Sequence, residues 1–170
     1  MKLTEANYYG KKANQEYMSV SQFKDFLKCP AMAMAKIRGE YVPERGRALI
    51  LGSFVDEMLT GTKKSQEKFI EENFSELFKK NGDPYADVAQ AIETIERVKK
   101  QPKMMHYLKG KHQVIMTGEI RGVPFKIKMD SFDPNEYICD LKYMASLRSP
   151  NLFEPMISYW GYDIQSACYK

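Results

Sequence analysis

The sequence predicts an α/β protein, with a helical N-terminal part followed by a small mixed sheet flanked by helices. Residues 1–17 give no firm periodic signal. From there to about residue 110, apolar side chains recur at helical spacing, whereas between Gln113 and residue 146 they alternate with a period of two. Asp133-Pro134-Asn135 separates two alternating segments and is typical of a hairpin turn. The chain of 170 residues can form one domain with its own core. We therefore expect a single domain over 1–170, mainly helical over 1–110 and with strands plus a helix over 111–170.

The first helix is predicted by a capping box, in which Ser19 is the N-cap and Gln22 the third helical residue. This helix ends before Pro30, and the next ends at Gly39, a residue suited to a left-handed cap. The expected helices after the first span residues 31–38, 48–59, 65–78 with Ser65 as N-cap, 86–100, one further turn at 104–108, and 154–169.

Three strands are expected between these helices, at 113–120, 123–132 and 137–146. Strands that follow one another through short turns form an antiparallel meander. The loop after the third strand contains Arg148 and Pro150, and Trp160 and Gly161 belong to the predicted buried stripe of the last helix.

Charged side chains interrupt the second and third strands. Because strand side chains alternate between faces, Asp130 shares a face with Lys128, and Asp140 shares a face with Lys142. Charges on the inner face of a half-buried strand are costly unless they are paired or bind a metal. In a suitable hairpin register the two carboxylates and the Lys142 ammonium converge, which is the arrangement of a metal-dependent phosphodiesterase. Acidic residues near hairpin turns are also common in proteins without such a site.

Four motifs, which together span most of the chain, occur in this order: YMSVSQFKDFLKCPAMAMAKIRGEY, LGSFVDEML, KIKMDSFDPNEYICDLKYMAS and WGYDIQSACYK. On these motifs and their order, the chain resembles the PD-(D/E)xK nuclease superfamily. Within it, the chain is similar to phage and prophage exonuclease-VIII-like proteins related to the RecB-type nuclease domain. The resemblance implies a PD-(D/E)xK nuclease-like core.

The resemblance also implies roles for individual residues. Asp130 and Asp140 would be metal carboxylates, the Leu141 carbonyl a further metal contact, and Lys142 the catalytic lysine, with Mg²⁺ or Mn²⁺ as cofactor. Asp56 stands where relatives have His or Glu, and is implied as a further ligand; an ordinary exposed helix acid is the alternative. Gln165 and Tyr169 match the family's Q-x-x-x-Y motif, which implies that they belong to the catalytic set, with the amide steadying the active site or the DNA and the tyrosine packing near it. A generic amphipathic helix would give the same spacing.

The implied activity is exonuclease hydrolysis of linear double-stranded DNA from its ends, in phage recombination. A phage single-strand-annealing protein and a ring-shaped homo-oligomer are the implied partners. Arg45, Arg47, Lys126 and Lys128 are candidate contacts to the DNA backbone. The alternatives are a non-catalytic DNA- or protein-binding module and an endonuclease of the same superfamily. Relatives continue past the last helix, so we expect either an unusually short protein or a truncated one.

Composition agrees with a polyanion partner, because the net charge is +4 and the pI about 8.8. An apolar run of about 18 residues, as a membrane span requires, is not found, and the N-terminus does not resemble a signal peptide. Three widely spaced cysteines favour a reducing cytoplasm. Cys29 is expected to be a small buried residue at a helix end. His106 and His112 are expected at the surface or in packing, and Glu119 is expected to pair with a lysine across the hairpin.

Overall fold

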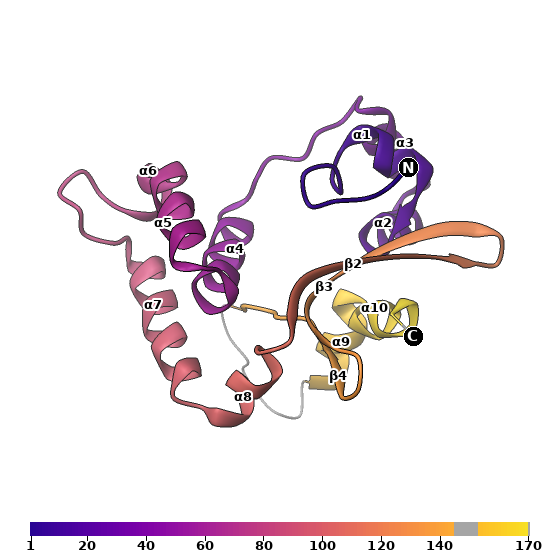
Figure 1. The fold of residues 1–170 in the computed structure, drawn as a ribbon. Helices are drawn as coiled ribbons and strands as arrows, with labels where there is room; N and C mark the ends of the chain where they lie inside the picture. The colour runs from indigo at the N-terminus through magenta and orange to yellow at the C-terminus, as the bar shows by residue number, and fades with distance from the viewer. Residues whose placement is uncertain (145–152, 170) are drawn as a thin grey trace. The chain divides into compact units, whose positions relative to one another are not determined.

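The computed structural model describes residues 1–144 and 153–169 (Figure 1). The chain forms two compact units, each built from separate stretches of sequence. Unit 1 comprises Met1–Pro43, Gln113–Met129 and Ser146–Lys170, and unit 2 comprises Glu44–His112 and Asp130–Ala145. The expected loop with Arg148 and Pro150 lies outside the described residues.

Unit 1 contains five helices among its described residues: α1 (Lys11–Glu16), α2 (Val20–Lys28), α3 (Pro30–Arg38), α9 (Phe153–Trp160) and α10 (Tyr162–Cys168). The capping box is confirmed, because the Ser19 hydroxyl accepts from the Gln22 backbone N–H and the Gln22 side chain accepts from that of Ser19. Gly39 adopts the expected left-handed cap, with φ of 79°. These local signals determine where α2 begins and where α3 ends.

The last helix is broken, although we expected it to be continuous. Gly161 has φ of 63° and separates α9 from α10. An ideal Cβ at this position would lie 2.7 Å from the Lys24 Cδ atom, so only glycine fits without a shift. The Lys24 ammonium also donates to the carbonyl of Trp160 across 3.0 Å. Trp160, which we expected to be buried, is 47% exposed.

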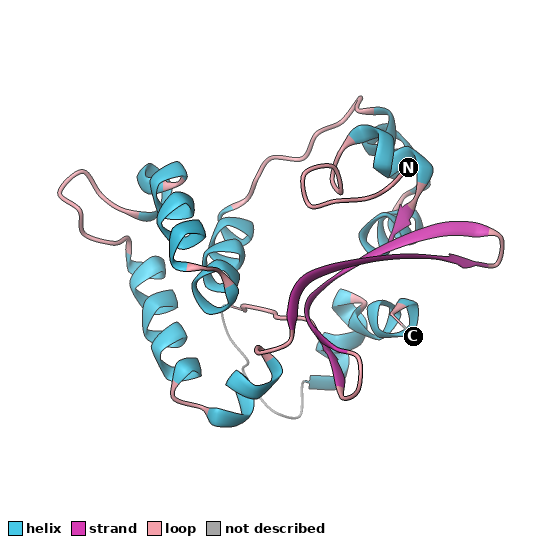
Figure 2. Ribbon diagram, in the orientation of Figure 1, coloured by secondary structure: helices cyan, strands magenta, loops and turns pink. Residues whose placement is uncertain are grey.

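The sheet is mixed, as the sequence predicted, and its main strand is β3 (Val123–Asp133) (Figure 2). On one edge β3 pairs with β2 (Lys111–Ile120) and on the other with β1 (Met18–Ser19), which runs parallel to it. The antiparallel strand β4 (Tyr137–Cys139) also pairs with β3. The β2–β3 turn has φ of 50° at Arg121 and 81° at Gly122, as in a tight hairpin turn with two left-handed residues.

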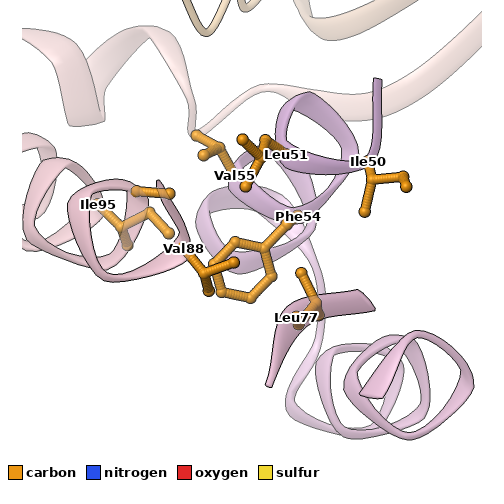
Figure 3. Close-up of a cluster of buried hydrophobic side chains, with 8 residues drawn as sticks. Ile50, Leu51, Phe54, Val55, Leu77, Val88 and Ile95 are labelled. Carbon is orange, nitrogen blue, oxygen red and sulfur yellow. The ribbon is translucent and has the colours of Figure 1, made fainter. Parts of the chain in front are cut away.

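Unit 2 contains α4 (Arg47–Thr60), α5 (Lys63–Glu72), α6 (Phe74–Leu77), α7 (Ala86–Lys99) and α8 (Pro102–Tyr107). Figure 3 shows the buried apolar cluster formed by α4, α6 and α7. Its buried members are Ile50, Leu51, Phe54, Val55, Leu77, Val88, Ala91 and Ile95. The helical spacing of apolar residues in the expected 48–59 and 86–100 helices therefore identified most of this core. Ile92 has the same spacing on α7, but it is 37% exposed.

The predicted 65–78 helix is also divided. Thr62 rather than Ser65 is its N-cap, because the Thr62 hydroxyl accepts from the Ser65 backbone N–H. Asn73 ends α5 and is itself buried, with its amide donating to the Phe69 carbonyl. Cys29, expected to be buried, is exposed between α2 and α3. Among the described helices, the longest have 14 residues, and none is long and apolar enough to cross a membrane.

Candidate functional site

The candidate site is formed by the C-terminal end of β3, the segment after β4 and helix α4, all within unit 2. The β3–β4 register pairs Ser131 with Cys139 and Asp133 with Tyr137. Extended by one residue, the same antiparallel register places Asp140 opposite Asp130. Directly opposite residues of an antiparallel pair project to one face, which is the convergence that the sequence required.

Regular pairing nevertheless ends at Cys139, so the strand expected over 137–146 is wrong for residues 140–144, and its last two residues lie outside the described part of the chain. The backbone N–H of Leu141 donates instead to the Asp130 Oδ2 atom across 2.7 Å. A donor used in this way is not available to the backbone of a neighbouring strand. Asp140, Leu141 and Lys142 therefore lie in an irregular segment held against β3 by the Asp130 side chain.

Several groups around Asp130 determine its acidity. The pKa of its carboxyl is raised to about 6, first by burial and then by the nearby carboxylates of Asp140 and Asp56. The Leu141 N–H and the Lys142 ammonium act in the opposite direction, because both favour the ionised form. The Asp130 carboxylate is therefore partly desolvated and lies in a locally negative environment.

Lys142 lies at this acidic group. Its ammonium forms an ion pair with the Asp140 Oδ2 atom, and the two side chains are 37% and 23% exposed. The sequence placed these two residues on one face of an expected strand, and the structure pairs them although this segment is not a regular strand. The structure thus brings Asp130, Asp140 and Lys142 into electrostatic contact.

Asp56 lies on α4, where its Oδ1 atom accepts from the Thr60 hydroxyl across 3.3 Å. Its charge acts on Asp130, which places the two carboxylates in one electrostatic environment. Within residues 1–144 and 153–169, however, no three His, Cys, Asp or Glu side chains are grouped so that they could hold one metal ion. The side-chain positions bring Asp56 near the acidic pair without forming a three-carboxylate cluster.

The residues present fit a hard divalent cation. Carboxylate and carbonyl oxygens are the donors that Mg²⁺ and Mn²⁺ prefer, and the Asp130 and Asp140 carboxylates with the Leu141 carbonyl supply such donors. The pKa of Asp130 is raised first by burial and in part by repulsion from the Asp140 and Asp56 carboxylates. A bound cation would relieve this repulsion.

Gln165 and Tyr169 lie in unit 1 and contact each other, as their spacing predicted. The Gln165 Nε2 atom donates to the Tyr169 hydroxyl across 3.0 Å, and this hydroxyl donates to the Lys128 carbonyl across 3.1 Å. Tyr169 therefore ties the C-terminal end of α10 to strand β3, two residues before Asp130 in the sequence.

The four basic candidates differ in what their side chains contact. Lys126 is 1% exposed, and its ammonium donates to the Tyr8 carbonyl at 2.5 Å and to the Asn14 Oδ1 atom at 2.6 Å. This burial lowers its pKa to about 8. The structure thus corrects the expectation for Lys126, because a buried ammonium with these partners cannot contact a DNA phosphate. Lys128 is only partly buried, and its ammonium lies 4.9 Å from the ring centre of Tyr9.

The two arginines contact other parts of unit 2. The Arg47 guanidinium forms a bidentate pair with Asp87, with both N–O distances 2.6 Å, and also donates to the Glu76 carbonyl. Arg45 is exposed and donates to the Asn73 Oδ1 atom across 3.2 Å. Arg47 consequently holds α4 against α7, a structural role that its position before a helix did not indicate.

The two histidines are exposed, in agreement with the expectation. The His106 Nε2 atom lies 2.9 Å from Glu136, and the His112 Nδ1 atom lies 3.3 Å from the carbonyl of Asp130. The contact of His112 with the Asp130 backbone was missed, because strand pairing rather than sequence spacing brings the two together.

Comparison with known proteins gives the following matches. A family model described as "PDDEXK-like domain of unknown function (DUF3799)" matches residues 19–170. A crystal structure described as "Putative exonuclease" from Eubacterium rectale has 41% sequence identity to this chain and superimposes with a TM-score of 0.87. That alignment covers 99% of this chain and 66% of the other, so the chain spans slightly less than two thirds of that protein. No curated protein matches. Because the family model covers most of the sequence, and the fold and the acidic hairpin agree with it, the chain belongs to the PDDEXK-like family.

Proposed function

We propose that this protein is a metal-dependent deoxyribonuclease that hydrolyses DNA phosphodiester bonds. The observation that carries the proposal is the electrostatic contact among Asp130, Asp140 and Lys142 in a chain of the PDDEXK-like family. Two carboxylates and an ammonium on irregular backbone next to a sheet provide cation ligands and a positive group for the substrate.

The proposed residues act in different ways. Asp130, Asp140 and the Leu141 carbonyl would hold Mg²⁺ or Mn²⁺, with Asp56 as a further oxygen donor from α4. When bound, the cation would polarise the phosphate and lower the pKa of an attacking water. The hydrogen bond from the Leu141 N–H keeps the Asp130 carboxylate in one orientation. Lys142 would orient the water or stabilise the charge that develops on the phosphate.

Gln165 and Tyr169 complete the proposed set as positioning residues. Their side-chain hydrogen bond is connected to the Lys128 carbonyl on β3. A strand held in this way has less freedom to shift along its axis, and the metal carboxylate Asp130 belongs to the same strand. Arg45 and Lys128 remain proposed contacts to DNA phosphates, because both side chains are at least partly exposed.

We further propose that the enzyme is an exonuclease acting on the ends of linear double-stranded DNA. This is supported by the description of the Eubacterium rectale neighbour as an exonuclease and by the 41% identity to it. The resemblance noted for the sequence also leads us to propose a cytoplasmic role in phage recombination, beside a single-strand-annealing protein and as a homo-oligomer.

The test is degradation of linear duplex DNA in the presence and absence of Mg²⁺. Asp140→Asn and Lys142→Ala should abolish cleavage while leaving the folded protein intact by circular dichroism. Matched controls are Glu93→Gln and Lys103→Ala, which change exposed residues on α7 and α8. Cleavage of closed circular DNA would identify an endonuclease instead. Salt-sensitive DNA binding without cleavage would identify a binding module and would contradict the proposal.

A further inference from the structure

The N-terminal segment before α1 is held in place by a buried lysine and an asparagine of unit 1. The Lys126 ammonium donates to the Tyr8 carbonyl and to Asn14 Oδ1, and Asn14 Nδ2 in turn donates to the Tyr9 carbonyl across 3.1 Å. Lys126 also lies 4.7 Å from the centre of the Tyr8 ring. The backbone of Tyr8 and Tyr9 is therefore bonded at both carbonyls, directly or through Asn14, to one lysine of β3.

The two tyrosines held by this arrangement differ in exposure. Tyr8 is 6% exposed and belongs to the core, whereas Tyr9 is 70% exposed. Their rings meet edge to face, at 4.9 Å between centres and 84° between planes. The backbone that carries the exposed ring is already fixed by hydrogen bonds. Binding a ligand therefore costs little conformational entropy, because only the side-chain angles of the ring still have to be ordered.

A lysine accompanies the exposed ring. The Lys128 ammonium lies 4.9 Å from the centre of the Tyr9 ring and 5.8 Å from that of Tyr8. Lys11 and Lys12, which follow Tyr9 after one glycine, are exposed as well. The surface around Tyr9 thus combines an accessible π-face with positive charge. This is the combination that proteins use for single-stranded nucleic acid, in which the base stacks and the ammonium contacts the phosphate.

We propose that Tyr9 and Lys128 bind an unpaired nucleotide of the DNA substrate, with the base stacked on Tyr9 and a phosphate contacted by Lys128. In a duplex, both faces of each base are covered by neighbouring bases except at the ends, so the ligand is a single strand or a frayed terminus. The inference rests on the proposed deoxyribonuclease function, and its stacking residue, Tyr9, lies outside residues 19–170, the part that matches the family model.

The experiment measures binding of a short fluorescent oligothymidine to the full chain by anisotropy, in EDTA so that no cleavage occurs. Tyr9→Leu should weaken binding by about tenfold or more, whereas Tyr9→Phe should bind like the wild type. The matched control is Tyr41→Leu, which removes a tyrosine that is 47% exposed in the same unit and should leave affinity unchanged. Thermal melting of each variant verifies that the fold is retained.

A second probe separates stacking from charge. An oligonucleotide of the same length that lacks bases should bind the wild type more weakly, and Tyr9→Leu should cause no further loss with it. Lys128→Gln should reduce the slope of log affinity against log salt by about 0.7, the value for one phosphate contact on a single strand.

Equal affinity of Tyr9→Leu and the wild type for oligothymidine would overturn the inference. If that protein also cleaves linear duplex DNA with Mg²⁺, the inference fails while the proposed function stands. If the wild type neither binds oligothymidine nor cleaves DNA, both fail. Unchanged DNA binding together with a Tyr9-dependent self-association in sedimentation would assign the surface to a second copy of the chain and would likewise overturn the inference.

Discussion

The backbone N–H of Leu141 donates to the side chain of Asp130 across 2.7 Å, at the point where strand β4 has ended. One hydrogen bond thus both orients a half-buried carboxylate and keeps the segment carrying Asp140 and Lys142 beside β3. The bond favours the ionised form of Asp130, but burial and the charges of Asp140 and Asp56 outweigh it.

The first prediction concerns the stability of the metal-free protein. Because the pKa of Asp130 is raised to about 6 from 3.8, its stabilising contribution is present below pH 4 and is lost as the pH rises through 6. In EDTA at pH 7.5, Asp130→Asn should therefore increase the free energy of unfolding by roughly 1 to 2 kcal/mol. Urea unfolding measures the change. The wild type should lose stability between pH 4 and 6 as Asp130 ionises, and the variant should not show this loss. A variant less stable than the wild type at pH 7.5 would contradict the electrostatic explanation.

The second prediction concerns metal binding. A ligand that binds only the folded state raises its stability, by about 2.7 kcal/mol at one hundred times the dissociation constant. Mg²⁺ should thus raise the melting temperature of the wild type, and should raise that of Asp140→Asn much less. Differential scanning fluorimetry with and without EDTA makes the comparison, and Glu93→Gln provides the control. An equal Mg²⁺ response in wild type and Asp140→Asn would exclude Asp140 as a ligand.

The third prediction concerns the buried ammonium of Lys126. Its pKa is lowered from 10.5 to about 8, so the unfolded chain binds more protons between these values and stability rises with pH there. Lys126→Met should remove this rise, which amounts to roughly 2 to 3 kcal/mol over the full window. Chemical unfolding at several pH values from 8 to 10 tests it. Lys103→Met, a change of an exposed lysine, should keep the wild-type slope.

The fourth prediction concerns Arg47 and Asp87. The pKa of the Asp87 carboxyl is lowered, first by its hydrogen bonds from Arg47. Both side chains are more than a third exposed, so solvent screening limits the contribution of the pair to about 1 kcal/mol. Arg47→Lys should cost this amount, because lysine cannot form the bidentate geometry. Breaking the exposed Lys99–Glu96 pair by Lys99→Ala should cost less; the reverse order in urea unfolding would contradict a special role for Arg47.

Features that depend on neighbouring residues were predictable from sequence. The Ser19–Gln22 capping box and the left-handed Gly39 are each formed within a single turn of chain, so the same residues give the same structure in many folds. The convergence of Asp130 with Asp140 was predictable for a similar reason, because a short hairpin turn and the side-chain alternation of strands leave few registers.

The features that the sequence predicted wrongly depend on residues that are distant in the sequence. Asn73 divides the expected 65–78 helix, and its buried side chain accepts a hydrogen bond from Arg45, which lies 28 residues earlier. From its place in the strand, Lys126 was expected to be accessible to DNA. It is buried because the N-terminal segment, which has no periodic signal, folds over it through Tyr8 and Asn14.

The sequence by itself determined the order and type of most elements, the apolar faces of α4 and α7, and the acidic hairpin with its lysine, because periodicity and turn chemistry act over a few residues. Only the tertiary structure decided which charges remain accessible. A charged side chain that finds hydrogen-bond partners at a distant part of the chain can be buried, as Lys126 is, while Lys128, two residues further along the same strand, remains accessible beside an exposed ring.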